Sequence, residues 1–278
     1  MFISVDGKVC FPCRIALNLR KFLEKIAPII VQATDFSRFT LWEARFETND
    51  LTPPPFSHYY HLILKKDARG YFASYELVYT HREELTEAEL VEEGFSLDDN
   101  RACQAYLHAA WVAQLEKLMA QTQPETRPRQ SKYNFLELHI RTQSGETQTF
   151  SPKNRLAWEM LLEQVVQGLM ETAKVEAPLV LGYCWQEQGK QQQYQIRWQF
   201  ANRTAVIIHA NKAFTISWQT GLSIMEQSFS IEADLDKGAT KPKLGNQISS
   251  GDGKWYPLLD KQQARWNALK ETIAKLAE

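Results

Sequence analysis

A seven-residue stretch in which apolar and polar side chains alternate without a break limits the possible folds more than any other part of the chain. The apolar members are Tyr194, Ile196, Trp198 and Phe200, and the polar members are Gln195, Arg197 and Gln199. Successive side chains of a β-strand point to opposite faces of the sheet, so this stretch is predicted to be a strand with one apolar face. Such half-buried strands are typical of an antiparallel sheet with helices on one side.

Similar stretches predict further antiparallel strands in both halves of the chain. They cover residues 38–46, 59–65 and 71–80 in the first half, and 204–209, 213–218 and 225–231 in the second. Two β-hairpins are also expected, one over residues 1–11 with its turn at Asp6-Gly7 and one over residues 136–150 with its turn at Ser144-Gly145. Glycine favours such turns because it tolerates the positive φ that they require.

Prolines and capping residues place the helices. Pro12 and Pro152 are expected to open helices, since proline at a first helical position removes only an N–H that would be unpaired there. The helix after Pro12 should end near Ile26. Two further helices are expected to close the halves, one capped by Asp98 or Asp99 and carrying 105–118, and one capped by Asp260.

Both halves therefore show the same order of hairpin, helix, antiparallel strands, long loop and helix. We predict an α+β fold with two similarly ordered halves and helices packed on antiparallel sheets. The expected modules are residues 1–122 and 132–278, joined by a polar linker over 123–131 that contains two prolines. Duplication of one ancestral module would explain this order, and coincidence remains the alternative reading.

Composition excludes several classes of protein. The 278 residues include 32 Lys plus Arg and 33 Asp plus Glu, with a formal net charge of −1. Wholesale disorder, a collagen-like repeat and a strongly basic nucleic-acid binder are excluded by these values. No membrane span or signal peptide is recognisable, so the cytosol is the expected compartment and the four cysteines are expected to be reduced thiols.

The sharpest motif is Cys10-Phe11-Pro12-Cys13. Two thiols separated by two residues at a helix start can support redox chemistry, because the helix N-terminus lowers a thiol pKa. The same pair could form a zinc site with His58 and His61, although the spacing is much longer than in a compact zinc finger. Simple packing of Cys10 in a hairpin strand is the competing interpretation, and no metal is assigned.

Two groups of polar residues are candidate sites. Glu137, His139 and Arg141 alternate with apolar neighbours and so share a strand face, where they could bind an anion, support proton transfer or form an exposed charge ladder. The second group is an acidic segment without Lys or Arg, which could dock a basic partner or lie solvated. Its glutamates are Glu83, Glu84, Glu87, Glu89, Glu92 and Glu93, followed by Asp98 and Asp99.

The motifs of common enzyme classes are absent. The sequence contains no Gly-x-Ser-x-Gly, no phosphate-binding loop and no Gly-x-Gly-x-x-Gly. The aromatic and basic residues of 194–218 could stack bases, but their alternation favours burial over nucleic-acid binding. The Gly- and Lys-rich stretch 234–254 is expected to be a long loop, either passive or functional, whose residues 237–246 could be deleted without loss of folding.

The leading functional hypothesis is a cytosolic, non-catalytic binding or assembly protein that acts through a protein partner. No catalytic residue, cofactor, nucleic acid or membrane is assigned, and the oligomeric state stays open. One alternative is a small-molecule-binding protein or enzyme with a cavity between a sheet and its helices. The other is a thiol redox protein that uses Cys10 and Cys13.

Overall fold

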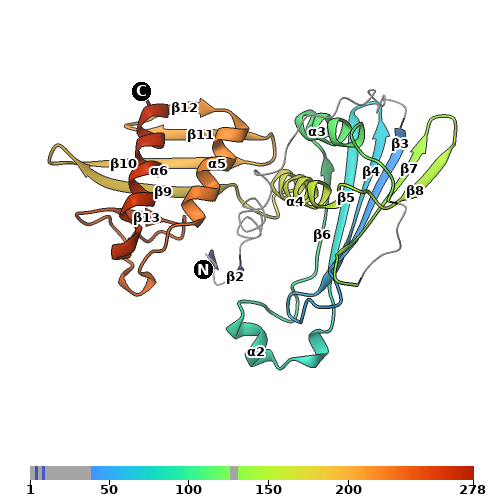
Figure 1. Ribbon diagram of the computed structural model, residues 1–278, viewed down its shortest axis with the longest axis horizontal. Helices are drawn as coiled ribbons and strands as arrows, with labels where there is room; N and C mark the ends of the chain where they lie inside the picture. The colour runs from blue at the N-terminus through green and yellow to red at the C-terminus, as the bar shows by residue number, and fades with distance from the viewer. Residues whose placement is uncertain (1–3, 6–7, 10–38, 126–130) are drawn as a thin grey trace. The chain divides into compact units, whose positions relative to one another are not determined.

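The computed structural model describes residues 4–5, 8–9, 39–125 and 131–278 (Figure 1). Within them the chain forms two six-stranded antiparallel sheets and five α-helices, together with a short ribbon of β1 (Ser4–Val5) and β2 (Lys8–Val9). This is the α+β class expected from the alternating strands. The chain divides into two compact units, a first unit over 24–176 and a second unit over 177–278 that also takes in residues 1–23.

The sheet of the first unit has the strand order β6-β5-β4-β3-β7-β8. Its strands are β3 (Phe39–Glu47), β4 (His58–Asp67), β5 (Gly70–Tyr79), β6 (Arg101–Tyr106), β7 (Phe135–Thr142) and β8 (Thr147–Phe150). The helices are α2 (Glu87–Glu92), α3 (Ala109–Met119) and α4 (Arg155–Thr172), and a 3-10 turn covers Arg82–Glu84. Helices α3 and α4 contact each other, and α4 also contacts β6, so the pair covers one face of the sheet.

The sheet of the second unit has the order β12-β11-β10-β9-β13-β14. Its strands are β9 (Leu179–Glu187), β10 (Lys190–Gln199), β11 (Thr204–His209), β12 (Lys212–Ile216), β13 (Gln247–Ser249) and β14 (Tyr256–Pro257). Helices α5 (Trp218–Phe229) and α6 (Gln263–Leu276) pack on each other across one face, and 3-10 turns cover Leu235–Lys237 and Asp260–Gln262.

The two sheets share one connectivity. In each, four strands follow one another as a meander, a helix comes next, two strands then add to the free side of the first meander strand, and a second helix closes the unit. Helix α3 in the first unit therefore has the same place in the chain order as α5 in the second, and α4 the same place as α6. In this shared connectivity, β7, β8 and α4 belong to the first sheet and its helices.

Each unit buries its own apolar core between the sheet and its helices. In the first, Trp42 of β3 stacks on Trp158 of α4 with ring centroids 5.8 Å apart, and both are fully buried. In the second, Trp185 of β9 meets Trp266 of α6 edge-on at 6.2 Å. Burial of such rings removes large apolar surfaces from water and is the main stabilising term for each unit.

Several elements agree with the sequence-based expectation. Strands β3, β4, β5, β10 and β11 lie close to their predicted ranges, and β7 and β8 form the hairpin with Gly145 at φ +86°. The closing helix α6 also forms. The pairing of β1 with β2 matches the first predicted hairpin, whereas its turn at residues 6–7 and the helix expected after Pro12 lie outside the described residues.

Three expectations were wrong. Residues 101–106 are strand β6 rather than the first part of a helix, and the helix begins only at Ala109, after His108, whose Nδ1 accepts a hydrogen bond from the N–H of Ala110. Residues 225–229 belong to helix α5, which Ser217 caps by accepting from the N–H of Thr220. The alternation over 225–231 is short enough to fit a helical face equally well. Helix α4 begins at Arg155, three residues after Pro152.

The division between the units falls after Glu176 rather than within 123–131. Strand β7 pairs with β3, so the chain after the expected linker returns to the first sheet. The segment before β7 is itself held there, because Glu125 N–H donates to Ser151 and Lys153 N–H donates to Gln123, both at 2.8 Å. The polar segment 123–131 with its two prolines therefore connects two parts of one sheet and is not a linker between units.

None of the described helices is both long and apolar enough to cross a membrane. Cys103 and Cys184 are free thiols, and both are buried. Burial raises the pKa of Cys103 to about 11, and the charge of Glu176 adds to the shift.

Candidate functional site

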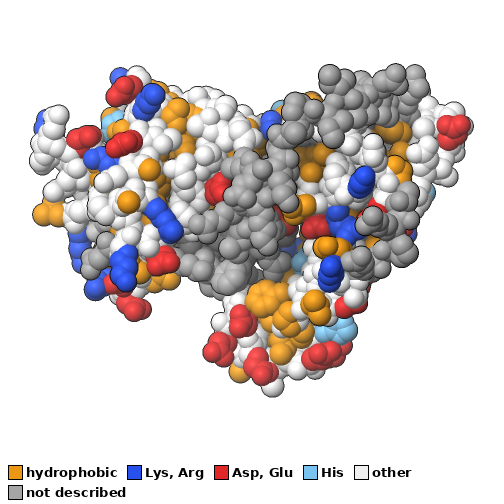
Figure 2. Space-filling view, viewed as in Figure 1, with side chains coloured by type: hydrophobic (Ala, Val, Ile, Leu, Met, Phe, Trp, Pro, Cys, Tyr) orange, Lys and Arg blue, Asp and Glu red, His pale blue; other side chains and the backbone are white. Residues whose placement is uncertain are grey.

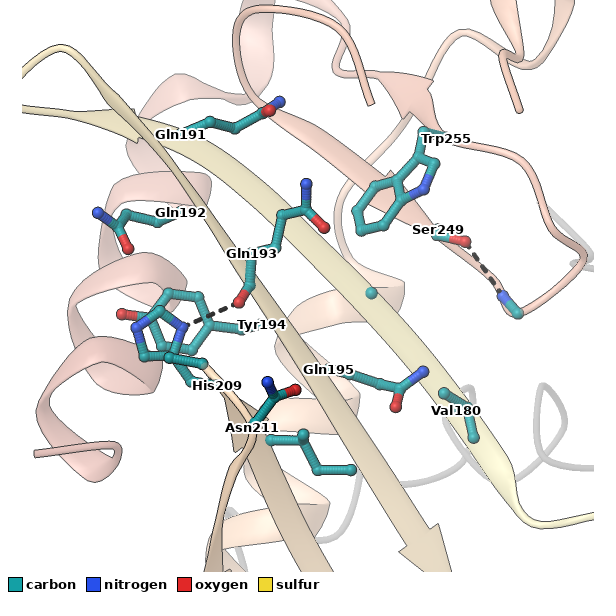
Figure 3. A pocket seen from close by; sticks show the side chains of 14 residues that line it. Val180, Gln191, Gln192, Gln193, Tyr194, Gln195, His209, Asn211, Ser249 and Trp255 are labelled. Carbon is teal, nitrogen blue, oxygen red and sulfur yellow. Dashed lines mark hydrogen bonds between the residues drawn. The ribbon is translucent and has the colours of Figure 1, made fainter. Parts of the chain in front are cut away.

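A groove lies on the face of the second sheet opposite α5 and α6 (Figure 3). Its volume is about 590 Å³, within the usual range for small-molecule sites. The strand side chains that line it, such as Val180, Gln195 and Ile208, alternate with the buried side chains of the helix-covered face. Strand alternation therefore explains why these strand residues face the groove, whereas Ser249 and Trp255 come from a distant segment.

The floor of the groove is Gly182 on β9, which pairs with Gln195 of β10 on one side and with Ser249 of β13 on the other. The indole of Trp255 lies on this glycine. A Cβ at residue 182 would come within 2.8 Å of the Trp255 ring and 3.1 Å of the Ser249 Cβ. Glycine is therefore needed at this position for Trp255 to occupy its place.

The loop that carries Trp255 is held on both sides of the indole. The backbone N–H of Trp255 donates to the backbone oxygen of Ala239 at 2.7 Å, and the backbone N–H of Ala239 donates to the backbone oxygen of Trp255 at 3.0 Å. Asp252 accepts from the N–H of Lys254 and from the hydroxyl of Tyr256. Burial, followed by this bond to Asp252, raises the pKa of Tyr256 to about 12. These contacts make Trp255 a fixed wall rather than a loosely attached side chain.

A row of glutamine side chains forms the opposite wall. Gln191, Gln193 and Gln195 lie at alternate positions of β10 and so point to the same face as Gly182. Gln191 is anchored, because its Nε2 donates to the backbone oxygen of Lys243 at 3.0 Å and contacts the Cys184 sulfur at 3.1 Å. The side-chain amides of Gln193 and Gln195 make no hydrogen bond to any described residue, so both remain available to a ligand.

The lining contains no Asp, Glu, Lys or Arg. Its titratable members, Tyr194 and His209, stack on each other with ring centroids 4.0 Å apart, and the His209 Nδ1 is 2.9 Å from the backbone oxygen of Gln193. Burial raises the pKa of Tyr194. The amide groups beside a fixed indole suit the site to binding a ligand through hydrogen bonds and an apolar surface.

The strand-face group of the first unit is where the sequence placed it. Glu137, His139 and Arg141 lie on the open face of β7. The Arg45 Nη1 is 3.9 Å from Glu137 Oε1, and the His139 Nδ1 is 2.7 Å from Thr149 Oγ1. The partners of this group thus include neighbouring strands, which favours the charge-ladder interpretation.

The acidic segment forms a lobe built by the β5–β6 connection, residues 80–100, and containing α2. Thr86 and Glu89 form a capping box, and the bonds to Thr86 lower the pKa of Glu89. Glu84 is 3.1 Å from the His81 ring. The exposed carboxylates that form no ion pair with any described residue are those of Glu83, Glu87, Glu89, Glu92, Glu93 and Asp98, of which Glu89 is bonded to Thr86.

The structure leaves the cysteine motif untested. Cys10 and Cys13 lie outside the described residues, so neither the redox nor the zinc hypothesis is decided. Among the residues that are described, no group of three or more His, Cys, Asp or Glu side chains is placed to hold a metal ion. The His58 Nδ1 donates to the backbone oxygen of Phe56 at 2.8 Å, and His61 is exposed on β4.

Sequence reasoning missed the groove because its parts come from distant segments. The stretch 234–254, expected to be an irregular loop, contains β13 and leads directly to Trp255. Gln247 in it is buried and accepts from the N–H of Lys243, so deletion of 237–246 would remove a partner of the sheet edge. The signal available was Gly182, a glycine within a continuous apolar strand, which often marks a close approach of another group.

Comparison of the chain with protein-family models, curated proteins and solved structures finds no match in any of the three.

Proposed function

We propose that the chain is a non-catalytic binding or assembly protein of the cytosol, and that its acidic lobe docks a basic protein partner. The observation that supports this proposal is the pairing of exposed carboxylates with exposed aliphatic side chains on one rigid lobe. Val91 is 62% exposed and Leu97 is 65% exposed. Figure 2 shows hydrophobic surface bordered by acidic side chains where the first unit carries α2.

The lobe has an internal scaffold that keeps its surface in place. The Arg82 guanidinium lies over the rings of Tyr79 and Phe95, at 4.2 and 4.7 Å from the centroids. Its Nη1 donates to the backbone oxygen of Ser96 at 2.7 Å and to Asp99 at 3.4 Å. Arg82 is the one Lys or Arg within residues 80–100, and its partners lie inside the lobe. It therefore does not pair with the exposed glutamates.

A partner for this surface needs two properties. Lysine or arginine side chains would neutralise the glutamates, and an apolar side chain would cover Val91 and Leu97. Charge complementarity of this kind mainly speeds association and selects the partner, and it weakens as salt screens exposed charges. The apolar contact supplies affinity that salt does not remove. A basic amphipathic segment combines both properties.

Capture from native extract tests the proposal with a matched pair of variants. In the lobe variant, Glu83, Glu87, Glu92 and Glu93 are replaced by Gln. In the control variant, the exposed carboxylates of Glu146, Glu232, Asp236 and Glu271 are replaced by the corresponding amides, which changes the net charge equally.

A basic protein should be captured in stoichiometric amount by the wild type and by the control at low salt, and lost from the lobe variant. The double variant Val91→Ser/Leu97→Ser should lose the part of binding that persists at high salt. Absence of a stoichiometric partner at low salt, or equal capture by lobe and control variants, would reject the proposal.

We also infer that the two units descend from one duplicated module. Support comes from the shared strand order and from the closing helices, because the fourth residue of α4 is Trp158 and the fourth residue of α6 is Trp266. Both tryptophans are buried against their own sheet. Two copies of one module would give an assembly protein two related surfaces that could diverge in what they bind.

A thiol redox role for Cys10 and Cys13 stays as an alternative. Mass spectrometry after mild oxidation separates it from the binding proposal, because a redox pair would form a Cys10–Cys13 disulfide. An enzyme site between a sheet and its helices has less support, since the aromatic and aliphatic side chains facing the helices fill both cores.

A further inference from the structure

We propose that the groove on the second sheet binds a neutral oligosaccharide. The inference concerns a different surface and ligand class from the acidic lobe, so either proposal can fail without the other. It rests on three features of the groove. These are the absence of charged residues from its lining, the row of amide side chains and the partly exposed indole of Trp255.

The first feature excludes several ligand classes. Phosphates, carboxylates and nucleotides are usually held by Lys, Arg or a helix N-terminus, and none of the lining residues is Lys or Arg. Arg197, the next outward residue of β10 after Gln195, lies beyond the lining. Cations require carboxylate, imidazole or thiolate ligands, and His209 is the only lining residue of these types. Its ring is stacked on Tyr194 and bonded to the Gln193 backbone oxygen. This lining favours an uncharged ligand.

The second feature matches hydroxyl groups. An amide side chain presents both a donor and an acceptor, and so does each hydroxyl of a sugar. The outward glutamines Gln191, Gln193 and Gln195 repeat every second residue and span about 13 Å of β10. Ser249 adds a hydroxyl on the other side of Gly182. A row of this length contacts more than one sugar ring, which indicates a chain of sugars.

The third feature supplies an apolar contact for the ring of a sugar. The chain has eight tryptophans, of which seven are buried in the two cores and Trp255 alone is partly exposed. Its indole lies against Gly182, and Figure 3 shows the Gln193 amide facing the indole. An indole face is a flat, weakly polar surface that can cover the C–H groups of a pyranose.

An extended peptide fits the groove less well. Peptides that join a sheet bond to the unpaired backbone of an edge strand. Here β9 is paired on both sides by β10 and β13, and β10 is paired on both sides by β9 and β11. Among the described residues, strand backbone left unpaired near the groove is limited to residues 190–193 on the β11 side of β10 and to the parts of β9 beyond residues 182–184 on the β13 side. At Gly182 and Gln195 both sides are paired, so this part of the groove offers side chains, which suits a ligand recognised through its hydroxyls.

Binding is tested on the full chain with cellopentaose, maltopentaose and N-acetylchitopentaose as neutral probes. An oligogalacturonate of similar length is the charged probe, and a neutral pentapeptide of Gly, Ser and Gln is the peptide probe. Calorimetry gives the affinity, and acrylamide quenching of tryptophan fluorescence reports on Trp255, the one partly exposed indole.

We expect at least one neutral saccharide to bind with a Kd of about 1 mM or tighter and to protect Trp255 from the quencher. Trp255→Ala and the double variant Gln193→Ala/Gln195→Ala should each weaken binding by about tenfold or more. Gln219→Ala is the matched control, because Gln219 is an exposed glutamine on α5, on the covered side of the sheet, and should leave affinity unchanged.

The proposal is overturned if no neutral saccharide binds at about 10 mM, if the double glutamine variant keeps wild-type affinity, or if only the peptide or the charged probe binds. Should Trp255→Ala fail to fold, Trp255→Phe and the double glutamine variant decide the question. The lobe variant with four Glu→Gln changes should keep full saccharide affinity, which separates this result from that of the partner experiment.

Discussion

The two sheets share a strand order and differ in what their open faces carry. On the helix-covered faces both are filled by aromatic and aliphatic side chains, with a buried tryptophan at the fourth position of the closing helix. On the open face, the first sheet carries the charge ladder that includes Arg45 and Glu137, whereas the groove on the second is lined by neutral glutamines and Trp255. Burial thus determines the shared architecture, and the open faces are free to acquire separate chemistry.

The closing helices differ in one detail that makes the comparison measurable. The Trp158 indole N–H donates to Thr122 Oγ1 at 2.8 Å. The corresponding nitrogen of Trp266 is buried without a hydrogen-bond partner among the described residues. An unpaired buried donor costs free energy, so the tryptophan of the closing helix is satisfied in the first unit and not in the second. Elsewhere each core has one further unpaired indole nitrogen among the described residues, that of Trp42 in the first and that of Trp185 in the second.

The largest expected effect is on stability, from Trp158→Ala in the first unit and Trp266→Ala in the second. Each removes a fully buried indole and should lower the free energy of unfolding by about 3–5 kcal/mol. Trp158→Ala should cost more, because it also removes the partner of Thr122. Chemical denaturation measures the cost.

Hydrogen exchange locates the effect of these two substitutions. We expect protection to fall most in residues 39–176 for Trp158→Ala and most in residues 177–278 for Trp266→Ala. Equal loss across both ranges for either variant would mean that the units do not have separate cores.

The next effect in size concerns the groove of the second sheet. Gly182→Ala places a Cβ 2.8 Å from the Trp255 ring, so the indole must move. Overpacking of this kind should cost about 1–3 kcal/mol and increase the quenching of Trp255 by acrylamide. Gly145→Ala lies in the β7–β8 turn, where the new methyl group meets open space and the φ of +86° strains an alanine. It is the control for a Gly→Ala change that destabilises without touching Trp255, and it should leave the quenching unchanged. Unchanged quenching in Gly182→Ala would contradict the described placement of Trp255.

Periodicity predicted much of the fold, and the reason is visible in particular residues. The alternation around Trp198 specifies a strand because burial on one face leaves only one acceptable register. It could not show that β7 returns to pair with β3, since pairing between residues about 100 apart leaves no local trace. The same limit misplaced the boundary between units, because the polar stretch before β7 resembles a linker.

The candidate sites were predicted to different degrees. The shared face of Glu137 and His139 followed from strand alternation, and both lie on the open face of β7. The groove could not be predicted, because it combines Gly182, Gln193 and Trp255 from separate segments that only the sheet brings together. Sequence alone shows which side chains share a strand face, whereas the site depends on which strands become neighbours.

The charge ladder of the first sheet gives a smaller effect. Arg45 is half-exposed and its Nε donates to Glu43 Oε1 at 2.7 Å. Arg45→Ala should lower the free energy of unfolding by about 0.2–1 kcal/mol, less at high salt. Arg197→Ala on the open face of β10 is the matched control, since Arg197 forms no ion pair with any described residue and should cost close to nothing. Equal costs for the two variants would remove the contrast between the faces.

The smallest effect is a pH dependence of stability from the fifth position of the closing helix, which α4 should show and α6 should not. Glu159 is the fifth residue of α4, and the corresponding residue of α6 is the neutral Asn267. Burial raises the pKa of Glu159, although its bond from Asn134 at 2.9 Å and the charge of Arg155 oppose the shift. Because the folded pKa exceeds the unfolded value of about 4.5, the contribution of this group to stability is full below that pH and is lost as pH rises through the folded pKa.

Glu159→Gln keeps an acceptor for Asn134 and removes the ionisation. Relative to the wild type, this variant should therefore be more stable at pH 8 than at pH 4, as measured by chemical denaturation at both values. Asn267→Gln changes no charge and should show no such difference between the two pH values. A variant that is instead relatively less stable at pH 8 would mean that attraction between the Glu159 carboxylate and Arg155 outweighs the cost of its burial, and the electrostatic contrast between α4 and α6 would then have the opposite sign.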